Sequence, residues 1–233
     1  MTVTLQTQEI TPSKPGDNES QIRDAVETLE EEIAFGYIHP RERLIEDDLL
    51  SRFRLKRHVV RQVLAELEQR GLIERRKNIG AFVKSYTVKE VIDLYAVREI
   101  LETNCIRQIA LPPAADKIDQ LIAIQREHDA GAAAAHLRQS FRANLAFHKT
   151  LFELCDNVAL RAAIEDFALR THTIRSFSMV FPSYLEKARV EHWEMIDALR
   201  RGDRDRLVEL HRTHLLPSRD AYVAQQRQYS KTQ

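Results

Sequence analysis

The strongest local pattern in this chain lies between Glu46 and Val83. In the stretch 57–70, apolar residues recur with the three-to-four residue spacing of a helix that buries one face, at Val60, Val63, Leu64 and Leu67. Gly71 follows in the position where glycine commonly ends a helix. A shorter helix precedes it, with acidic residues at its start, where negative charge suits the helix dipole. The pattern therefore predicts two consecutive helices joined by a turn.

Two short strand-like runs follow the second helix. They cover residues 72–76 and 81–83, and the residues between them, Lys77-Asn78-Ile79-Gly80, are typical of a turn. Helix, turn, helix and hairpin in this order make a winged helix-turn-helix, in which the second helix enters the major groove of DNA.

Local charge supports a DNA-binding surface. Arg57, His58 and Arg61 crowd the first turn of the second helix, where cations are unfavourable unless an anion such as phosphate lies nearby. Residues 52–84 contain ten Lys and Arg against three Asp and Glu, whereas residues 20–51 contain three against nine. The whole chain balances at 35 of each sign, so only the local count reveals the basic region.

The remaining composition favours a mainly α protein with a C-terminal all-helical bundle. Only six glycines occur in 233 residues, and apolar periodicity predicts helices near 87–110, 114–130, 133–155, 158–179, 184–201 and 203–226. The predicted parts are a flexible tail at 1–19, a winged helix-turn-helix domain at 20–85 and a helical domain at 86–233.

The chain shows no sign of secretion or membrane insertion. The polar start lacks the apolar core of a signal peptide, and no later run is long enough to span a bilayer, which predicts a cytoplasmic protein. Cys105 and Cys155 lie on apolar-periodic segments, so we expect buried thiols rather than a disulfide.

Three histidines, His148, His192 and His214, lie on apolar faces of three different predicted helices. A single histidine on such a face is usually a hydrogen-bonded core residue, but three that converge in one bundle can bind a divalent metal. Asn144 precedes His148 by one helical turn and can reach the same point. Periodicity alone leaves His211 as a rival of His214.

Four short segments, in their order and spacing, resemble the DNA-binding domain of GntR-family bacterial regulators. They cover residues 33–40, 44–46, 57–61 and 78–80. The helical remainder is similar to the FadR-like branch of that family, which carries an all-helical FCD effector domain. The resemblance extends over roughly residues 20–225.

The resemblance implies a set of DNA-binding residues: Lys56, Arg57, His58, Arg61, Asn78 and Gly80. Arg57, Arg61 and Gly80 match the family pattern. Lys56 instead stands where a capping Ser or Thr is common, and His58-Val59 replaces Thr-Pro. Asp47 and Ile79 occupy positions where the family often has arginine. These departures imply an altered operator sequence.

The resemblance also implies a metal site made by Asn144, His148, His192 and His214, with Zn²⁺ or Ni²⁺ as the expected ion. The family spacing favours His214 over His211. Asn144 stands where the family usually has Asp, which removes one negative charge from the site and predicts weaker or effector-dependent metal binding.

Three further residues are expected to bind the effector: Arg98, His172 and Arg175. Arg98 matches an arginine that faces the ligand cavity in similar proteins, where its guanidinium can bind a carboxylate in bidentate fashion. A structural salt bridge from Arg98 to Glu102, one turn further on, is an equally good interpretation.

The resemblance therefore implies a homodimeric DNA-binding regulator, a repressor, that binds an inverted-repeat operator and responds to a small organic acid, with a divalent metal in the site. A plain metal sensor uses the same residues. A metal-dependent enzyme is disfavoured, because no carboxylate is placed as a general base: Glu191 points about 100° away from His192 around their helix.

Overall fold

The computed structural model describes residues 18–178 and 181–229. The predicted flexible tail lies outside these ranges, except that Asn18 and Glu19 already belong to the first helix. The N-terminal elements are α1 (Asn18–Ala34), β1 (Arg43–Leu44), α2 (Glu46–Phe53), α3 (Arg57–Gln69), β2 (Ile73–Arg76) and β3 (Gly80–Val83). The C-terminal elements are α4 (Val88–Gln108), α5 (Ala115–Ala133), α6 (Leu137–Glu153), α7 (Val158–Arg170), α8 (His172–Phe177), α9 (Pro182–Arg201) and α10 (Arg204–Tyr229). The predicted mainly α fold is confirmed.

The N-terminal elements form the predicted winged helix-turn-helix. The apolar face of α3 packs against α1 and α2, and Val60, Val63, Leu64 and Leu67 are buried in one core. The sheet has three antiparallel strands in the order β1-β3-β2, one more than predicted. β1 has two residues, which is too short for its alternation to be recognised in a sequence.

The start of α3 and the wing turn have the geometry that their residues dictate. Lys56 occupies the N-cap position of α3 and makes no side-chain capping hydrogen bond, so the capping interaction of a Ser or Thr is missing. In the turn between β2 and β3, Asn78 and Gly80 have φ of 61° and 130°, which are conformations that asparagine and glycine tolerate best.

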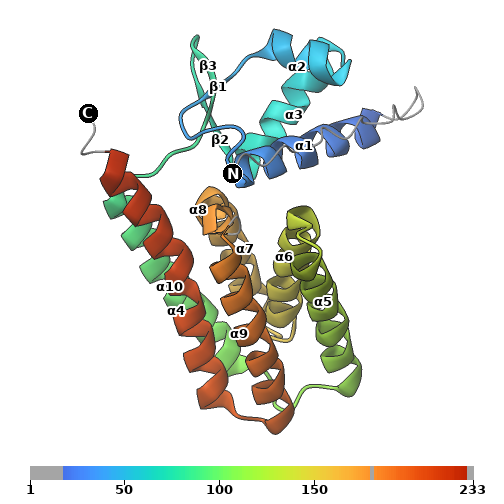
Figure 1. Ribbon diagram of the computed structural model, residues 1–233, viewed down its shortest axis with the longest axis vertical. Coiled ribbons are helices and arrows are strands. Elements are labelled where there is room, and N and C mark those ends of the chain that lie inside the picture. Colours follow the sequence, from blue (N-terminus) through green and yellow to red (C-terminus); the bar gives the residue numbers. More distant parts are fainter. Residues whose placement is uncertain (1–17, 179–180, 230–233) are drawn as a thin grey trace.

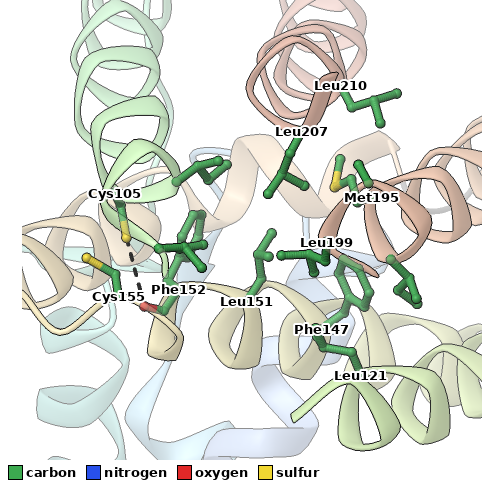
Figure 2. Packing of buried hydrophobic residues seen from close by; sticks show 14 of the residues in the cluster. Cys105, Leu121, Phe147, Leu151, Phe152, Cys155, Met195, Leu199, Leu207 and Leu210 are labelled. Carbon is green, nitrogen blue, oxygen red and sulfur yellow. Dashed lines mark hydrogen bonds between the residues drawn. The ribbon is translucent and has the colours of Figure 1, made fainter. Parts of the chain in front are cut away.

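The C-terminal helices surround a main apolar core and a smaller second cluster, and α4 and α10 run side by side along the bundle (Figure 1). Figure 2 shows Phe147, Leu151 and Leu199 filling the space between the helices of this core. Both cysteines are free and buried, as predicted. Among the described residues, no helix combines the length and apolar character needed to cross a membrane.

The predicted single helix over 158–179 is wrong. It is divided at Thr171 into α7 and α8. The Thr171 hydroxyl donates a hydrogen bond to the Phe167 carbonyl oxygen at 2.8 Å, an interaction that competes with the helical backbone and favours a helix end. The break lets α8 contact α1 of the N-terminal domain.

Helix α1 lies across one end of the bundle and joins the two parts of the chain (Figure 1). Its Glu31, only 4% exposed, accepts hydrogen bonds from Arg142 at 2.9 and 3.1 Å and from Arg138. Its Glu30, 5% exposed, pairs at 3.0 Å with Arg70, the residue that follows α3. Buried carboxylates persist only when such partners compensate the lost hydration.

A second interdomain contact lies at Gly71, behind the C-terminus of α3. Gly71 has φ of 70°, and a Cβ atom there would lie 2.8 Å from the carbonyl oxygen of Leu169 in α7. Gly36 has a similar φ of 76°, but a Cβ atom there would meet nothing within 4 Å. A substitution at Gly36 therefore tests backbone strain alone, whereas one at Gly71 tests backbone strain together with a steric clash.

We predict that Gly71→Ala lowers the free energy of unfolding more than Gly36→Ala. Gly36→Ala should cost about 1 kcal/mol from the left-handed backbone alone, and Gly71→Ala should add the clash with α7. Urea denaturation of both variants measures the difference. Equal decreases in the free energy of unfolding would contradict the prediction, because they would mean that α7 can move away from residue 71 without destabilising the protein.

Candidate functional sites

Three imidazoles meet inside the bundle. His148 comes from α6, His192 from α9 and His214 from α10, and each offers a ring nitrogen that lies within 4.8 Å of the others. The Nε2 atoms of His148 and His214 are 3.1 Å apart. Two nitrogens bound to one tetrahedral Zn²⁺ at about 2.0–2.1 Å are separated by roughly 3.3 Å, so this pair already has the required spacing.

Neighbouring side chains orient two of these rings. Glu191 Oε2 lies 2.7 Å from His214 Nδ1, and Gln125 Oε1 lies 2.8 Å from His192 Nδ1. When Nδ1 carries the proton, both oxygens accept a hydrogen bond from Nδ1–H, which leaves the Nε2 lone pair of each ring for a metal. The prediction that Glu191 points away from the site is wrong, because the side chain faces α10 and reaches His214 rather than its sequence neighbour.

Burial keeps the histidines neutral. It lowers the pKa of His148 and of His192 well below the usual value, and the neighbouring imidazole of His214 lowers both further. Burial also lowers the pKa of His214, although Glu191 opposes the shift. Neutral imidazole is the form that binds metal ions, so the cluster needs no proton loss at pH 7.

The donor set fits a divalent ion. Within the described residues, the buried Nε2 of His192 has no hydrogen-bond partner, and a buried nitrogen without a partner costs free energy that a metal would recover. Asn144 borders the same cavity as His148 and His214, and its amide oxygen can complete the set. His211 does not join them, because its Nε2 lies 2.7 Å from Glu102.

Two cavities adjoin the cluster. The smaller, about 60 Å³, is bordered by Asn144, His148, His214 and Glu191. The larger, about 470 Å³, lies between α4, α6, α7 and α8, and Glu30 of α1 contributes to its wall. Arg98, His148 and Arg175 border both cavities and so separate them.

The charges around these cavities are unequal. Arg98, 4% exposed, donates from Nε to Glu102 at 2.7 Å, while its Nη1 has no hydrogen-bond partner among the described residues. Burial opposes ionisation of Glu102, but Arg98 and His211 hold its pKa at about 2. Burial, reinforced by Arg98, lowers the pKa of Arg175 to about 10. Two cations therefore face one anion. The salt bridge from Arg98 to Glu102 is confirmed, and Arg98 borders both cavities, where its binding of an effector carboxylate stays a prediction.

His172 is the remaining residue that the sequence predicts to bind the effector. It borders the larger cavity, and its Nε2 is 3.3 Å from Glu30 Oε1. The structure thus brings Arg98, Arg175 and His172 to one cavity, although they lie on two helices far apart in the sequence.

Five of the six predicted DNA-binding residues are exposed, and the sixth, Gly80, is partly exposed. Lys56, Arg57, His58 and Arg61 are exposed at the start of α3, and Asn78 is exposed in the wing turn. Arg57 pairs with Asp47 of α2 at 2.9 Å, and Arg61 lies 3.7 Å from Glu46. The sequence did not predict these pairs. They involve exposed side chains, so they are weak and phosphate can replace the carboxylates.

Two family models match this architecture. The model for bacterial regulatory proteins of the gntR family matches residues 21–83, and the FCD domain model matches residues 93–216, more than half of the chain. The chain is a GntR-family transcription regulator with an FCD domain. It is a DNA-binding regulator and not an enzyme.

Solved structures share the fold of this regulator. A GntR transcriptional regulator from Rhodococcus sp. RHA1 is 19% identical, with a TM-score of 0.70, and the match covers 88% of this chain and 98% of that one. McbR/YncC from E. coli is 15% identical, with a TM-score of 0.72 and the same coverage. The comparison with curated proteins found no match.

Sequence analysis missed the residues that support the site. Glu191, Gln125 and Glu102 each bond a histidine from a different helix. Glu191 follows Lys187 by four residues, which indicates an ordinary surface ion pair. No spacing in the sequence connects these residues with their histidine partners.

We predict that Glu102→Gln destabilises the protein by about 3–5 kcal/mol, because it leaves Arg98 and Arg175 without a buried counter-ion. Glu99 lies on α4 like Glu102, but it forms an exposed ion pair with Arg212 of α10. Glu99→Gln should therefore cost less than about 1 kcal/mol. Urea denaturation near pH 7 measures both. Similar losses for the two variants would mean that the central charges are solvated.

Proposed function

We propose that this regulator is a homodimeric repressor whose FCD domain binds a small organic acid beside a divalent metal, and that this binding changes the affinity of the winged helix-turn-helix domains for an inverted-repeat operator. Repression is the more common outcome in similar proteins. The finer parts of the proposal rest on the following observations.

The observation that carries the proposal is the surplus of positive charge inside the bundle. Arg98 and Arg175 face Glu102 alone, and Arg98 Nη1 has no partner within the described chain. A bound carboxylate would restore charge balance and accept hydrogen bonds from the guanidinium groups. The preferred ligand is therefore an anion, and a carboxylate matches the planar guanidinium best.

A divalent metal would add a second binding point for the same carboxylate. His148, His192 and His214 would hold it, with Asn144 as an oxygen ligand, and the ion would attract the ligand's negative charge. Zn²⁺ and Ni²⁺ both suit three imidazoles. Because Asn144 is neutral, it adds no charge to hold the ion, and an effector carboxylate would supply the missing charge.

A short chain of contacts supports coupling between the effector site and the DNA-binding helix. Glu30 borders the larger cavity and pairs with Arg70, which caps the C-terminus of α3. Arg142, which binds Glu31, lies on the same helix as Asn144 and His148. A ligand that changes the position of α6 or Glu30 therefore acts on contacts that hold the DNA-binding domain.

Two observations support a dimer on a symmetric operator. The exposed basic end of α3 can serve one half-site, and a two-fold dimer presents two such ends. On α4, Ile92, Ala96 and Ile100 form an exposed apolar stripe at four-residue spacing, with Ile92 48% and Ile100 61% exposed. An apolar stripe of this kind can pack against its copy in a second chain.

A plain metal sensor is the second candidate, because the three histidines would bind the ion without any organic acid. The two candidates differ in the role of Arg98 and Arg175, which a metal sensor does not need.

For DNA binding, we predict that Arg57→Ala weakens binding to an operator selected from random double-stranded DNA. If Arg57 contacts a base, the loss should be about 1–3 kcal/mol. If it contacts phosphate, the slope of log affinity against log salt concentration should fall by about one. Arg23→Ala, which removes an exposed arginine on α1, is the control. Fluorescence anisotropy at several salt concentrations measures both effects. Unchanged affinity and salt dependence in Arg57→Ala would contradict the assignment.

For the metal, we predict about one divalent ion per chain in protein purified without chelator, lost in His148→Ala and retained in His136→Ala, which changes an exposed histidine outside the cluster. Glu191→Gln should lower metal affinity about 10–100-fold, because it removes the group that orients His214. Asn144→Asp should raise it. Elemental analysis and metal titration measure these changes.

Operator binding with metal alone and with metal plus citrate, butanoate or hexanoate distinguishes the two candidates. The proposed function expects at least one of these acids to change operator affinity in the wild type and not in Arg98→Ala or Arg175→Ala. A saturable effect of Zn²⁺ or Ni²⁺ alone, equal in all three proteins, would instead establish the metal sensor.

A further inference from the structure

The larger cavity is more than an extension of the metal site. Its wall is mostly apolar between α6 and α7, where Leu145, Phe152, Ile164, Ala168 and Leu169 border it. Helix α7 packs against α4 and makes few contacts with α6, although the two helices follow each other in the chain. The gap between them is therefore a built feature of the bundle, and α4 forms its floor.

The volume of this cavity decides what kind of ligand fits it. At about 470 Å³ it lies within the range of about 300–1,000 Å³ that is usual for sites of drug-sized ligands. The smaller cavity, at about 60 Å³, has room for an ion with a few water molecules or for one end of a ligand. An acid of three or four carbons would leave most of the apolar wall in contact with water.

The charges specify one end of the ligand. Arg98 and Arg175 border the cavity on the side of the histidine cluster, and the unpartnered Nη1 belongs to a side chain that is 4% exposed. The other charged residues of the α6–α7 segment are balanced, with Lys149 and Arg161 against Glu153 and Glu165. Glu30, which also borders the cavity, is paired with Arg70 at 3.0 Å. Among the described lining residues, the uncompensated positive charge therefore lies at Arg98 and Arg175, which share Glu102.

We propose that the larger cavity binds the apolar body of the effector while its carboxylate lies against Arg98 and Arg175. The effector is then a monocarboxylate with an aliphatic chain or an aromatic ring, rather than a short polar di- or tricarboxylate. This inference rests on the proposed function, in which a carboxylate is the effector, and names the chemical class of that ligand.

The test is calorimetric titration of butanoate, hexanoate and octanoate into the full-length protein. Each methylene group that enters the cavity should raise the affinity about fourfold. Ala168→Phe and Ala162→Phe place a ring in the cavity, and they should abolish this gain while they leave the affinity for butanoate unchanged. Two such variants are used because either one could disturb folding.

Ala159→Phe is the matched control, since Ala159 is an exposed residue of the same helix and does not border the cavity. It should keep the full gain with chain length. Equal affinity for the three acids, or a gain that survives in both cavity variants, would overturn the inference and leave a carboxylate-controlled regulator intact. If none of the three acids nor citrate binds, the proposed function itself fails, and the inference with it.

Discussion

The arrangement of this regulator depends on carboxylates that α1 carries into the interdomain contact. Glu31 and Glu30 are almost fully buried, and each is compensated by arginines from other elements, Arg142 and Arg70 among them. Breaking such a pair leaves a buried charge without a partner, which is costly. Small displacements of α1 relative to the C-terminal helices are therefore unfavourable, since they would break these buried pairs. It also explains the acidic excess of residues 20–51, part of which serves domain packing.

The same desolvation acts on the centre of the FCD domain, with opposite results for two kinds of cation. Imidazole loses its proton when buried, so His148 and His192 become neutral metal donors. Guanidinium keeps its proton, so Arg98 and Arg175 remain cations. One buried environment can thus supply lone pairs for a metal and positive charge for a carboxylate. The two lie close together, since His148, Arg98 and Arg175 all border both cavities.

On the exposed surface at the start of α3, solvent weakens ion pairs instead of strengthening them. The pairs of Arg57 with Asp47 and of Arg61 with Glu46 are exposed, so each contributes little to stability. They hold the two arginines close to α2, and exposed pairs of this kind can exchange their carboxylates for phosphate. Asp47, which departs from the family pattern, thus sets the starting position of Arg57.

The sequence alone determined the winged helix-turn-helix and the missing side-chain cap at Lys56, because periodicity and residue type are local properties that survive folding. It placed His148 and His192 on buried helix faces, but the preference for His214 over His211 came from the family resemblance and not from periodicity. It missed β1, which is too short for a pattern, and the helix end at Thr171, where a side-chain hydrogen bond overrides an apolar period. Only the tertiary structure placed Glu191 on His214 and Glu30 in the wall of the larger cavity. Those contacts join separate helices, and a one-dimensional pattern shows which face of a helix is buried but not which residues of another helix it meets.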